Sequence, residues 1–320
     1  MNNQYAHLND EEILRLRPPK HAVDPKRPYA FTHESEAAAN GQVVDVSTVF
    51  LTNSECPFRC LMCDLWMNTT DQSVPSGAIP QQIDYALDRL PPARHIKLYN
   101  SGNFFDSKAI PPADYSDITQ RVRRFENVIV ENHPRLCTDK CLHFQSMLEE
   151  TSLEIAMGLE TIHPRVLPAL NKQMNLNDYT RAVEYLLNHG IAVRSFILLK
   201  PPFLLEEEGV EWALKSIEYA FANGVGCCAV IPTRSGNGMM EQLEAQMHFV
   251  PPCLSSLERV MEEGLAVASA RGRVIVDLWD LERFANCDRC FEQRRERLHR
   301  MNLVQKNLPP IACSCQKVRL

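Results

Sequence analysis

Three cysteines lie within eight residues near the first fifth of this 320-residue chain. They are Cys56, Cys60 and Cys63, in the order C-x3-C-x2-C. Thiolates are soft ligands that suit iron-sulfur clusters, and three on one short loop can hold three irons of a cubane and leave the fourth iron open. An open iron is a place for chemistry. The alternatives are a zinc knuckle and a loop that holds no metal.

The residues before these cysteines position them. Residues 46–52 are rich in β-branched side chains and predict a largely buried strand, so the cysteine loop follows the carboxyl end of a strand. In βα barrels active sites are built on this face. Here the chain resembles the radical S-adenosylmethionine (SAM) superfamily, whose cluster motif has this spacing at this place, although Met62 stands where an aromatic residue is common.

The resemblance implies a cofactor and a reaction. Cys56, Cys60 and Cys63 would hold a [4Fe-4S] cluster, and the methionine end of SAM would chelate its open iron. One electron would then cleave SAM to a 5′-deoxyadenosyl radical that abstracts hydrogen from a substrate.

From residue 46 the chain alternates short apolar runs with longer amphipathic ones, which is typical of βα units. The runs predict strands at 46–52, 95–100, 127–131, 153–157, 191–199, 226–231 and 273–278. Helices are expected near 81–90, 114–124, 139–150, 176–189, 207–223 and 254–271. With the resemblance, this pattern predicts an α/β fold: a partial (βα)6 TIM-like barrel of radical SAM type, with room for an added strand. We divide the chain into an N-terminal arm, the barrel and a C-terminal cysteine-rich metal-binding extension, at residues 1–40, 41–280 and 281–320.

A polar turn follows the second expected strand. Radical SAM enzymes often carry a Gly-Gly-Glu-like motif there that binds the SAM amino group, and Ser101, Gly102 and Asn103 resemble a variant of it. Asn103 supplies no negative charge. An ordinary Gly-Asn turn is the alternative.

Three more residues are expected to contact SAM. Glu131 and Glu160 end the third and fourth expected strands, where cofactor hydroxyls and amines would be bound. For each, a carboxylate at a helix start or in a salt bridge is the alternative. Arg194, on the fifth expected strand, would hold the SAM carboxylate or form an inward-facing salt bridge.

Further segments narrow the resemblance to a subgroup. Gly158-Leu159-Glu160-Thr161, Leu170-Asn171-Lys172 and Leu199-Lys200-Pro201-Pro202-Phe203 resemble the group that contains the archaeosine synthase radical subunit and, more distantly, the elongator catalytic subunit. This resemblance covers roughly residues 46–235. It makes tRNA or its modified base the first candidate substrate, with a small molecule or a peptide as the alternative. The expected electron donor is a flavodoxin- or ferredoxin-like protein.

The C-terminal extension carries a second set of cysteines: Cys287, Cys290, Cys313 and Cys315. Four thiolates in two close pairs could form a closed zinc site or hold an auxiliary iron-sulfur cluster, and unliganded thiols are the third alternative. From residue 288 onward the chain has eight Lys or Arg and three Asp or Glu, a local charge of 8 − 3 = +5. This basic stretch could bind RNA or an acidic partner, or form a solvated helix face.

The overall composition restricts the possible partners. The net charge is −6, which gives no global attraction to nucleic acid. No apolar stretch is long enough to span a membrane, and the N-terminus is polar, so we expect a cytoplasmic protein without a membrane partner. A non-catalytic iron-sulfur or zinc-binding protein is the alternative to an enzyme.

Overall fold

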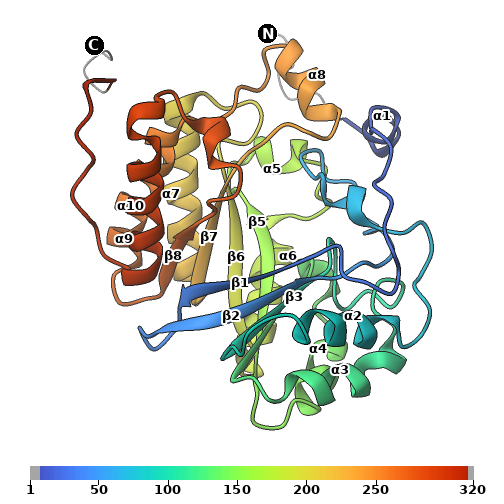
Figure 1. Cartoon of the computed structure of the whole chain (residues 1–320). Coiled ribbons are helices and arrows are strands. Elements are labelled where there is room, and N and C mark those ends of the chain that lie inside the picture. The colour runs from blue at the N-terminus through green and yellow to red at the C-terminus, as the bar shows by residue number, and fades with distance from the viewer. Residues whose placement is uncertain (1–7, 316–320) are drawn as a thin grey trace.

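The computed structural model describes residues 8–315, and within them eight strands form one sheet that curls into a partial barrel (Figure 1). The strands follow one another in the sheet in sequence order, β1 to β8. β1 is antiparallel to β2, and every later neighbour is parallel. The strands are β1 (Ala30–Ala37), β2 (Val43–Phe50), β3 (His95–Tyr99), β4 (Asn127–Glu131), β5 (Ser152–Glu160), β6 (Ala192–Leu199), β7 (Cys227–Pro232) and β8 (Arg273–Val276).

Helices cover the outside of this sheet (Figure 1). The six helices predicted from the sequence are all present, as α2, α3, α4, α6, α7 and α9, and the tail helix is α10. In chain order the helices are α1 (Asp10–Arg15), α2 (Ala78–Leu87), α3 (Tyr115–Val122), α4 (Asp139–Ser146), α5 (Val166–Ala169), α6 (Leu176–Asn188), α7 (Glu206–Ala222), α8 (Met239–Ala245), α9 (Leu254–Ala268) and α10 (Asp288–Val304). The predicted α/β partial barrel is confirmed, and it has more strands than the six of the basic pattern.

The central strands form because both of their faces are buried. Val128, Ile129 and Val130 of β4 are completely buried, as expected of a parallel strand with helices outside and a filled interior. α6 begins at a capping box, in which Asn175 and Asp178 each bond the other's backbone N–H. Its buried side chains then pack on the sheet.

β1 is the strand that the sequence analysis missed, because it placed residues 1–40 in a polar arm. The inward positions of β1 carry carboxylates, so the strand has no apolar run to reveal it. Glu36 is buried nonetheless, beside cations from other strands. The Arg273 guanidinium of β8 donates to the Ala37 carbonyl at the end of β1, so the two edges of the sheet meet.

The described part of the arm before β1 lies on the cysteine loop, residues 56–63. Ile13 of α1 is buried in an apolar cluster that includes Leu61 of this loop. Arg17 and Lys20 form ion pairs of 2.6 and 2.9 Å with Glu55. The basic residues of the arm therefore help to hold the cysteine loop.

Within residues 8–315, every helix is too short or too polar to cross a lipid bilayer.

Candidate functional site

The cysteine loop follows β2, at the carboxyl end of the parallel strands. Its backbone is held by neighbouring loops: the Leu61 N–H donates to the Leu170 carbonyl at 2.9 Å. The Asn237 side-chain amide donates to the carbonyls of Leu61 and Cys63, at 2.8 and 3.1 Å. Segments after β2, β5 and β7 thus fix the loop at the mouth of the barrel.

The three thiols of this loop fit a cluster better than a single ion. Among residues 8–315, the tail cysteines alone bring three or more candidate ligand atoms within 4.8 Å of one another. A closed zinc site would need a fourth ligand, whereas three thiols suit three irons of a cubane and leave the fourth iron open.

Polar groups surround these sulfurs. The Asn103 side-chain amide donates to Cys56 Sγ at 3.1 Å. Burial raises the pKa of the Cys60 thiol to about 11, and the positive charge of Lys172 acts in the opposite direction. A thiolate at this position is therefore favoured by the amide and the ammonium group and opposed by burial, which a bound metal would offset.

Glu160 and Lys172 form a buried ion pair beside the loop. Lys172 Nζ lies 2.7 Å from Glu160 Oε1. A Cβ added at Gly158 would lie 2.0 Å from Glu160 Oε1 and 2.5 Å from Lys172 Nζ, so only glycine leaves room for the pair. Burial acts to lower the pKa of Lys172, but Glu160, Cys60 and Cys56 together outweigh burial and raise that pKa. Lys172 belongs to a motif in the sequence, but its place beside the cysteines could not be read from spacing.

The predicted turn at residues 101–103 is anchored by Glu131. One carboxylate oxygen of Glu131 accepts from the N–H groups of Asn100 and Gly102, at 2.6 and 3.2 Å. Burial raises the pKa of Glu131 to about 7, and these N–H groups act against the rise. The Ser101 hydroxyl donates to the Tyr29 hydroxyl at 2.9 Å. The structure thus brings four predicted residues together next to Cys56; their contact with SAM stays a prediction.

His133 connects this turn to the cysteine loop. Its ring stacks on Phe58 with centroids 3.8 Å apart, and its backbone N–H donates to Asn103 Oδ1 at 2.7 Å. Burial, with the charge of Lys172, lowers the pKa of His133 to about 3, so the ring is neutral at physiological pH. A neutral stacked ring positions the loop and supplies no charge.

Arg194 lies apart from the other predicted residues, near the amino-terminal end of β6. Its guanidinium bonds Glu36 at 2.5 Å and Glu154 at 2.9 Å. Lys97 pairs with the same Glu36 at 2.6 Å. These charges from β1, β3, β5 and β6 form a floor inside the barrel, opposite the mouth. The inward-facing salt bridge named as an alternative is what the structure shows, and SAM binding by Arg194 stays a prediction.

Aromatic rings form a layer between this floor and the mouth. Tyr99 and Phe196 stand two residues after Lys97 and Arg194, so each lies on the same face of its strand as that cation. The ring centroids of Tyr99 and Phe196 lie 6.1 Å apart. β3 and β6 are not neighbours in the sheet, so this contact crosses the barrel interior. The ring centroid of Phe50 lies 6.2 Å from that of Tyr99 and 6.0 Å from that of Trp279. Trp279 is 55% exposed and extends the layer toward solvent. These residues could not be predicted from the sequence, because the register of distant strands decides which aromatic side chains face inward.

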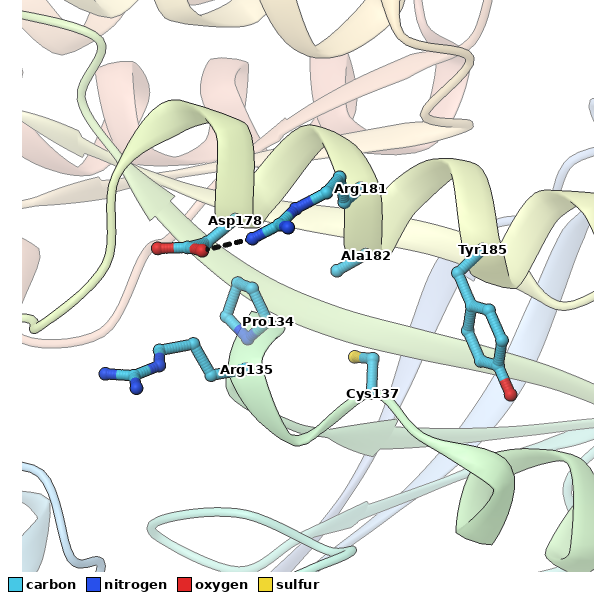
Figure 2. A pocket seen from close by; sticks show the side chains of 7 residues that line it. All are labelled: Pro134, Arg135, Cys137, Asp178, Arg181, Ala182 and Tyr185. Carbon is cyan, nitrogen blue, oxygen red and sulfur yellow. Dashed lines mark hydrogen bonds and ion pairs between the residues drawn. The ribbon is translucent and has the colours of Figure 1, made fainter.

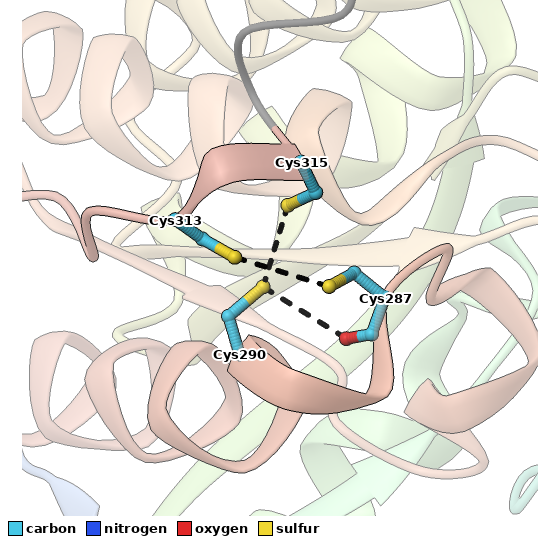
Figure 3. Close-up of side chains that lie close together, drawn as sticks. All are labelled: Cys287, Cys290, Cys313 and Cys315. Atoms are coloured by element: carbon cyan, nitrogen blue, oxygen red, sulfur yellow. Dashed lines mark hydrogen bonds between the residues drawn. The ribbon is translucent and has the colours of Figure 1, made fainter.

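The tail cysteines come together although 25 residues separate Cys290 from Cys315 (Figure 3). Cys287 and Cys290 lie at the start of α10, and Cys313 and Cys315 come from the segment that returns along this helix. Their four sulfurs lie within 4.8 Å of one another. The predicted second set of thiols is therefore brought together at one point.

Part of the basic tail is used internally. Arg294 pairs with Glu258 of α9 at 2.6 Å, and Arg297 pairs with Glu262 at 2.5 Å. Both guanidinium groups are buried. Two of the charges counted in the sequence are therefore not available to RNA, and Lys317 and Arg319 lie outside the described residues.

A pocket of about 450 Å³ lies outside the barrel, between the loop after β4 and α6 (Figure 2). Arg181 on its rim is paired with Asp178 at 2.8 Å. Cys137 lines this pocket, with its sulfur 3.4 Å from Met157 Sδ. Cys137 is therefore a packed residue and not a member of the tail set.

Comparison with known proteins agrees with the predicted resemblance. An uncharacterized protein of Methanocaldococcus jannaschii is 23% identical over 99% of this chain and 93% of its own length. Archaeosine synthase subunit beta of Methanosarcina acetivorans is 24% identical over 87% of this chain and 85% of its own. The solved structure of Methanocaldococcus infernus Elp3 matches with a TM-score of 0.51 at 14% identity, which shows the shared fold; the match covers 69% of this chain and 59% of that one. No family model matches.

Proposed function

We propose that this chain, a member of the radical SAM superfamily, is an enzyme that cleaves SAM reductively and acts on a nucleobase, with tRNA as the first candidate substrate. The observation that carries the proposal is the arrangement in the barrel: three thiols on one loop at the mouth, above an interior lined by aromatic rings.

The residues of the mouth fit the cofactors that the resemblance implies. Cys56, Cys60 and Cys63 would hold a [4Fe-4S] cluster. When bound, the cluster and SAM supply a 5′-deoxyadenosyl radical, for which the electron would come from a flavodoxin- or ferredoxin-like donor. The turn at 101–103 and the Glu160 carboxylate would orient SAM beside the cluster.

The chain's own contribution is positioning and exclusion of water. The Asn103 amide holds Cys56, and the stacked His133 and Phe58 fix the loop. The described arm covers the loop, since Ile13 and Leu61 belong to one buried apolar cluster. A partly covered site of this kind limits the access of solvent to a reactive radical.

The aromatic layer supports a flat substrate. Bases removed from a stack are commonly bound on aromatic side chains, and each such contact contributes about 1–3 kcal/mol. Phe50, Tyr99 and Phe196 are half-buried, and Trp279 is exposed at the rim. The name of the archaeosine synthase subunit beta relatives agrees with a tRNA base.

A radical enzyme for a small molecule or a peptide is the second candidate. The net charge of −6 and the internal use of Arg294 and Arg297 favour it, because they leave a weaker electrostatic footprint for RNA.

The test is anaerobic reconstitution followed by iron, sulfide and zinc analysis and a 5′-deoxyadenosine assay with SAM and dithionite. SAM cleavage is expected, and an intact cluster without cleavage would instead indicate a binding protein. The binding of unmodified tRNA transcripts and of a short peptide is then compared at two salt concentrations. Salt-dependent binding of tRNA supports the first candidate, and its absence supports the second.

A further inference from the structure

We infer that the four tail cysteines bind a single zinc ion that clamps the end of the chain to α10 and so secures the seam of the barrel. The inference does not depend on the proposed function. Its starting point is that all four side chains point toward one centre (Figure 3).

The distances between the sulfurs match one ion. Cys287 Sγ lies 3.9 Å from Cys313 Sγ, and Cys290 Sγ lies 3.7 Å from Cys315 Sγ. Zn–S bonds of about 2.3 Å in a tetrahedron place the sulfurs about 3.8 Å apart. A disulfide would bring two sulfurs to about 2 Å, and a cubane would hold them farther apart than is seen.

The donor set indicates zinc and a structural role. Four thiolates in a tetrahedron suit zinc or iron, and zinc binds more tightly than ferrous iron at such sites. All four positions are filled by protein sulfur, which leaves no place for a substrate or for SAM. This site is therefore closed, in contrast to the loop with three thiols.

The ion would anchor the far end of a segment that is otherwise held by side-chain hydrogen bonds and by the packing of Leu308 on the core. Residues 305–315, here called the strap, run back along α10. Arg297 donates to the carbonyls of Leu308 and Pro309, at 2.6 and 2.8 Å. Arg289 donates to the Ser314 hydroxyl at 3.1 Å. The metal would add covalent ligation at the far end of the strap.

α10 in turn covers the free edge of β8. The Asn302 amide accepts from the Val276 N–H at 2.9 Å and donates to the Val276 carbonyl at 2.8 Å. Gln305 makes the same pair of bonds to Val274, at 3.0 and 2.9 Å. Two side-chain amides thus take the place of a neighbouring strand, which an edge strand otherwise leaves open. The clamp fixes the start of the helix whose end seals the barrel.

The experiment uses the full chain, purified anaerobically, with metals counted per chain and amide hydrogen exchange measured by mass spectrometry. The double variant Cys313→Ser/Cys315→Ser is compared with the control Lys306→Ala, which changes an exposed residue of the strap and keeps all four thiols. We expect about one zinc per wild-type chain, a loss of at least tenfold in the double variant and no loss in the control. Exchange in the strap should rise at least tenfold in the double variant, with the iron content unchanged.

Cobalt substitution of the wild-type protein adds a test that needs no variant. Tetrahedral Co²⁺ bound by four thiolates should give intense visible bands and a thiolate charge-transfer band. Four additional irons that disappear in the double variant would show that the tail holds a cluster and not a single ion. One iron in place of zinc would show that the single ion is not zinc. Four freely alkylated tail thiols with no bound metal would overturn the site.

Discussion

The two cysteine sets differ in the number of thiols that they offer and in the groups that surround them. The tail set places four sulfurs within 4.8 Å, which fits one closed tetrahedral ion, whereas the cysteine loop at the mouth offers three thiols, which would leave one iron of a cluster open. The tail set joins a helix start to a returning strap, away from the aromatic layer. The loop at the mouth lies among an amide, an ion pair and a stacked histidine. Spacing in sequence does not separate a structural metal from a reactive one; the number of thiols that meet in space and the groups around them do.

The largest effect is expected from a substitution in the cysteine loop at the mouth, which tests whether this loop holds the catalytic cluster. Cys60→Ala should abolish both the cluster and SAM cleavage, because three thiolates are needed to leave one iron open. Iron should fall to background while zinc in the tail stays at the wild-type level, as measured by elemental analysis of the reconstituted protein. Cys228→Ala, which removes a buried strand cysteine, is the control and should keep both metals. Retained 5′-deoxyadenosine formation in Cys60→Ala would contradict the assignment.

Glu131→Gln tests whether a titrating carboxyl supports the mouth. The folded pKa of Glu131 is raised to about 7 from an ordinary value of 4.5, chiefly by burial. Between pH 4.5 and pH 7 the Glu131 carboxyl is protonated in the folded protein and ionised in the unfolded chain. The protonated carboxyl therefore contributes fully to stability below pH 4.5, and its contribution is lost as pH rises through 7. The slope is about 1.4 kcal/mol per pH unit in that window.

Glutamine keeps the acceptor for the two N–H groups without the charge. The stability of Glu131→Gln relative to wild type should therefore increase from pH 5 to pH 8, as measured by chemical denaturation of the holoprotein. Glu150→Gln, at an exposed position, is the control and should show no such trend. The same trend in both variants would show that Glu131 does not cause this pH dependence of stability.

Asn302→Ala tests the structural side of the comparison. The substitution leaves the Val276 N–H and carbonyl without their side-chain partner at a buried edge, which should cost about 1–3 kcal/mol. Asn307→Ala is the control, because its side chain is exposed and donates one bond to a helix carbonyl at 3.1 Å. Its effect should stay within about 0.5 kcal/mol. Equal losses in both variants, measured by denaturation, would show that α10 does not seal β8.

The sequence predicted the parts of this molecule that depend on local pattern. Apolar runs located β2 through β8, and cysteine spacing located both thiol sets. β1 was missed because its inward positions carry Glu34 and Glu36, which are neutralised only by cations from other strands. The place of Lys172 beside the cysteines and the aromatic layer across the barrel depend on long-range packing, which no local spacing encodes.

The smallest expected effect concerns the electronic setting of the loop at the mouth. The Asn103 amide donates to Cys56 Sγ, and a donor to a cluster sulfur favours the reduced, more negative state. If this bond contributes about 1 kcal/mol, Asn103→Ala should lower the midpoint potential of a bound cluster by about 40 mV. Asn132→Ala, which alters the neighbouring loop without touching a loop cysteine, should leave the potential unchanged. An EPR-monitored redox titration measures both. Because zinc has no redox chemistry, the same titration should show one cluster only. A second signal that is absent from Cys313→Ser would mean that the tail is also an electron carrier, and the two sets would then differ in position and not in kind.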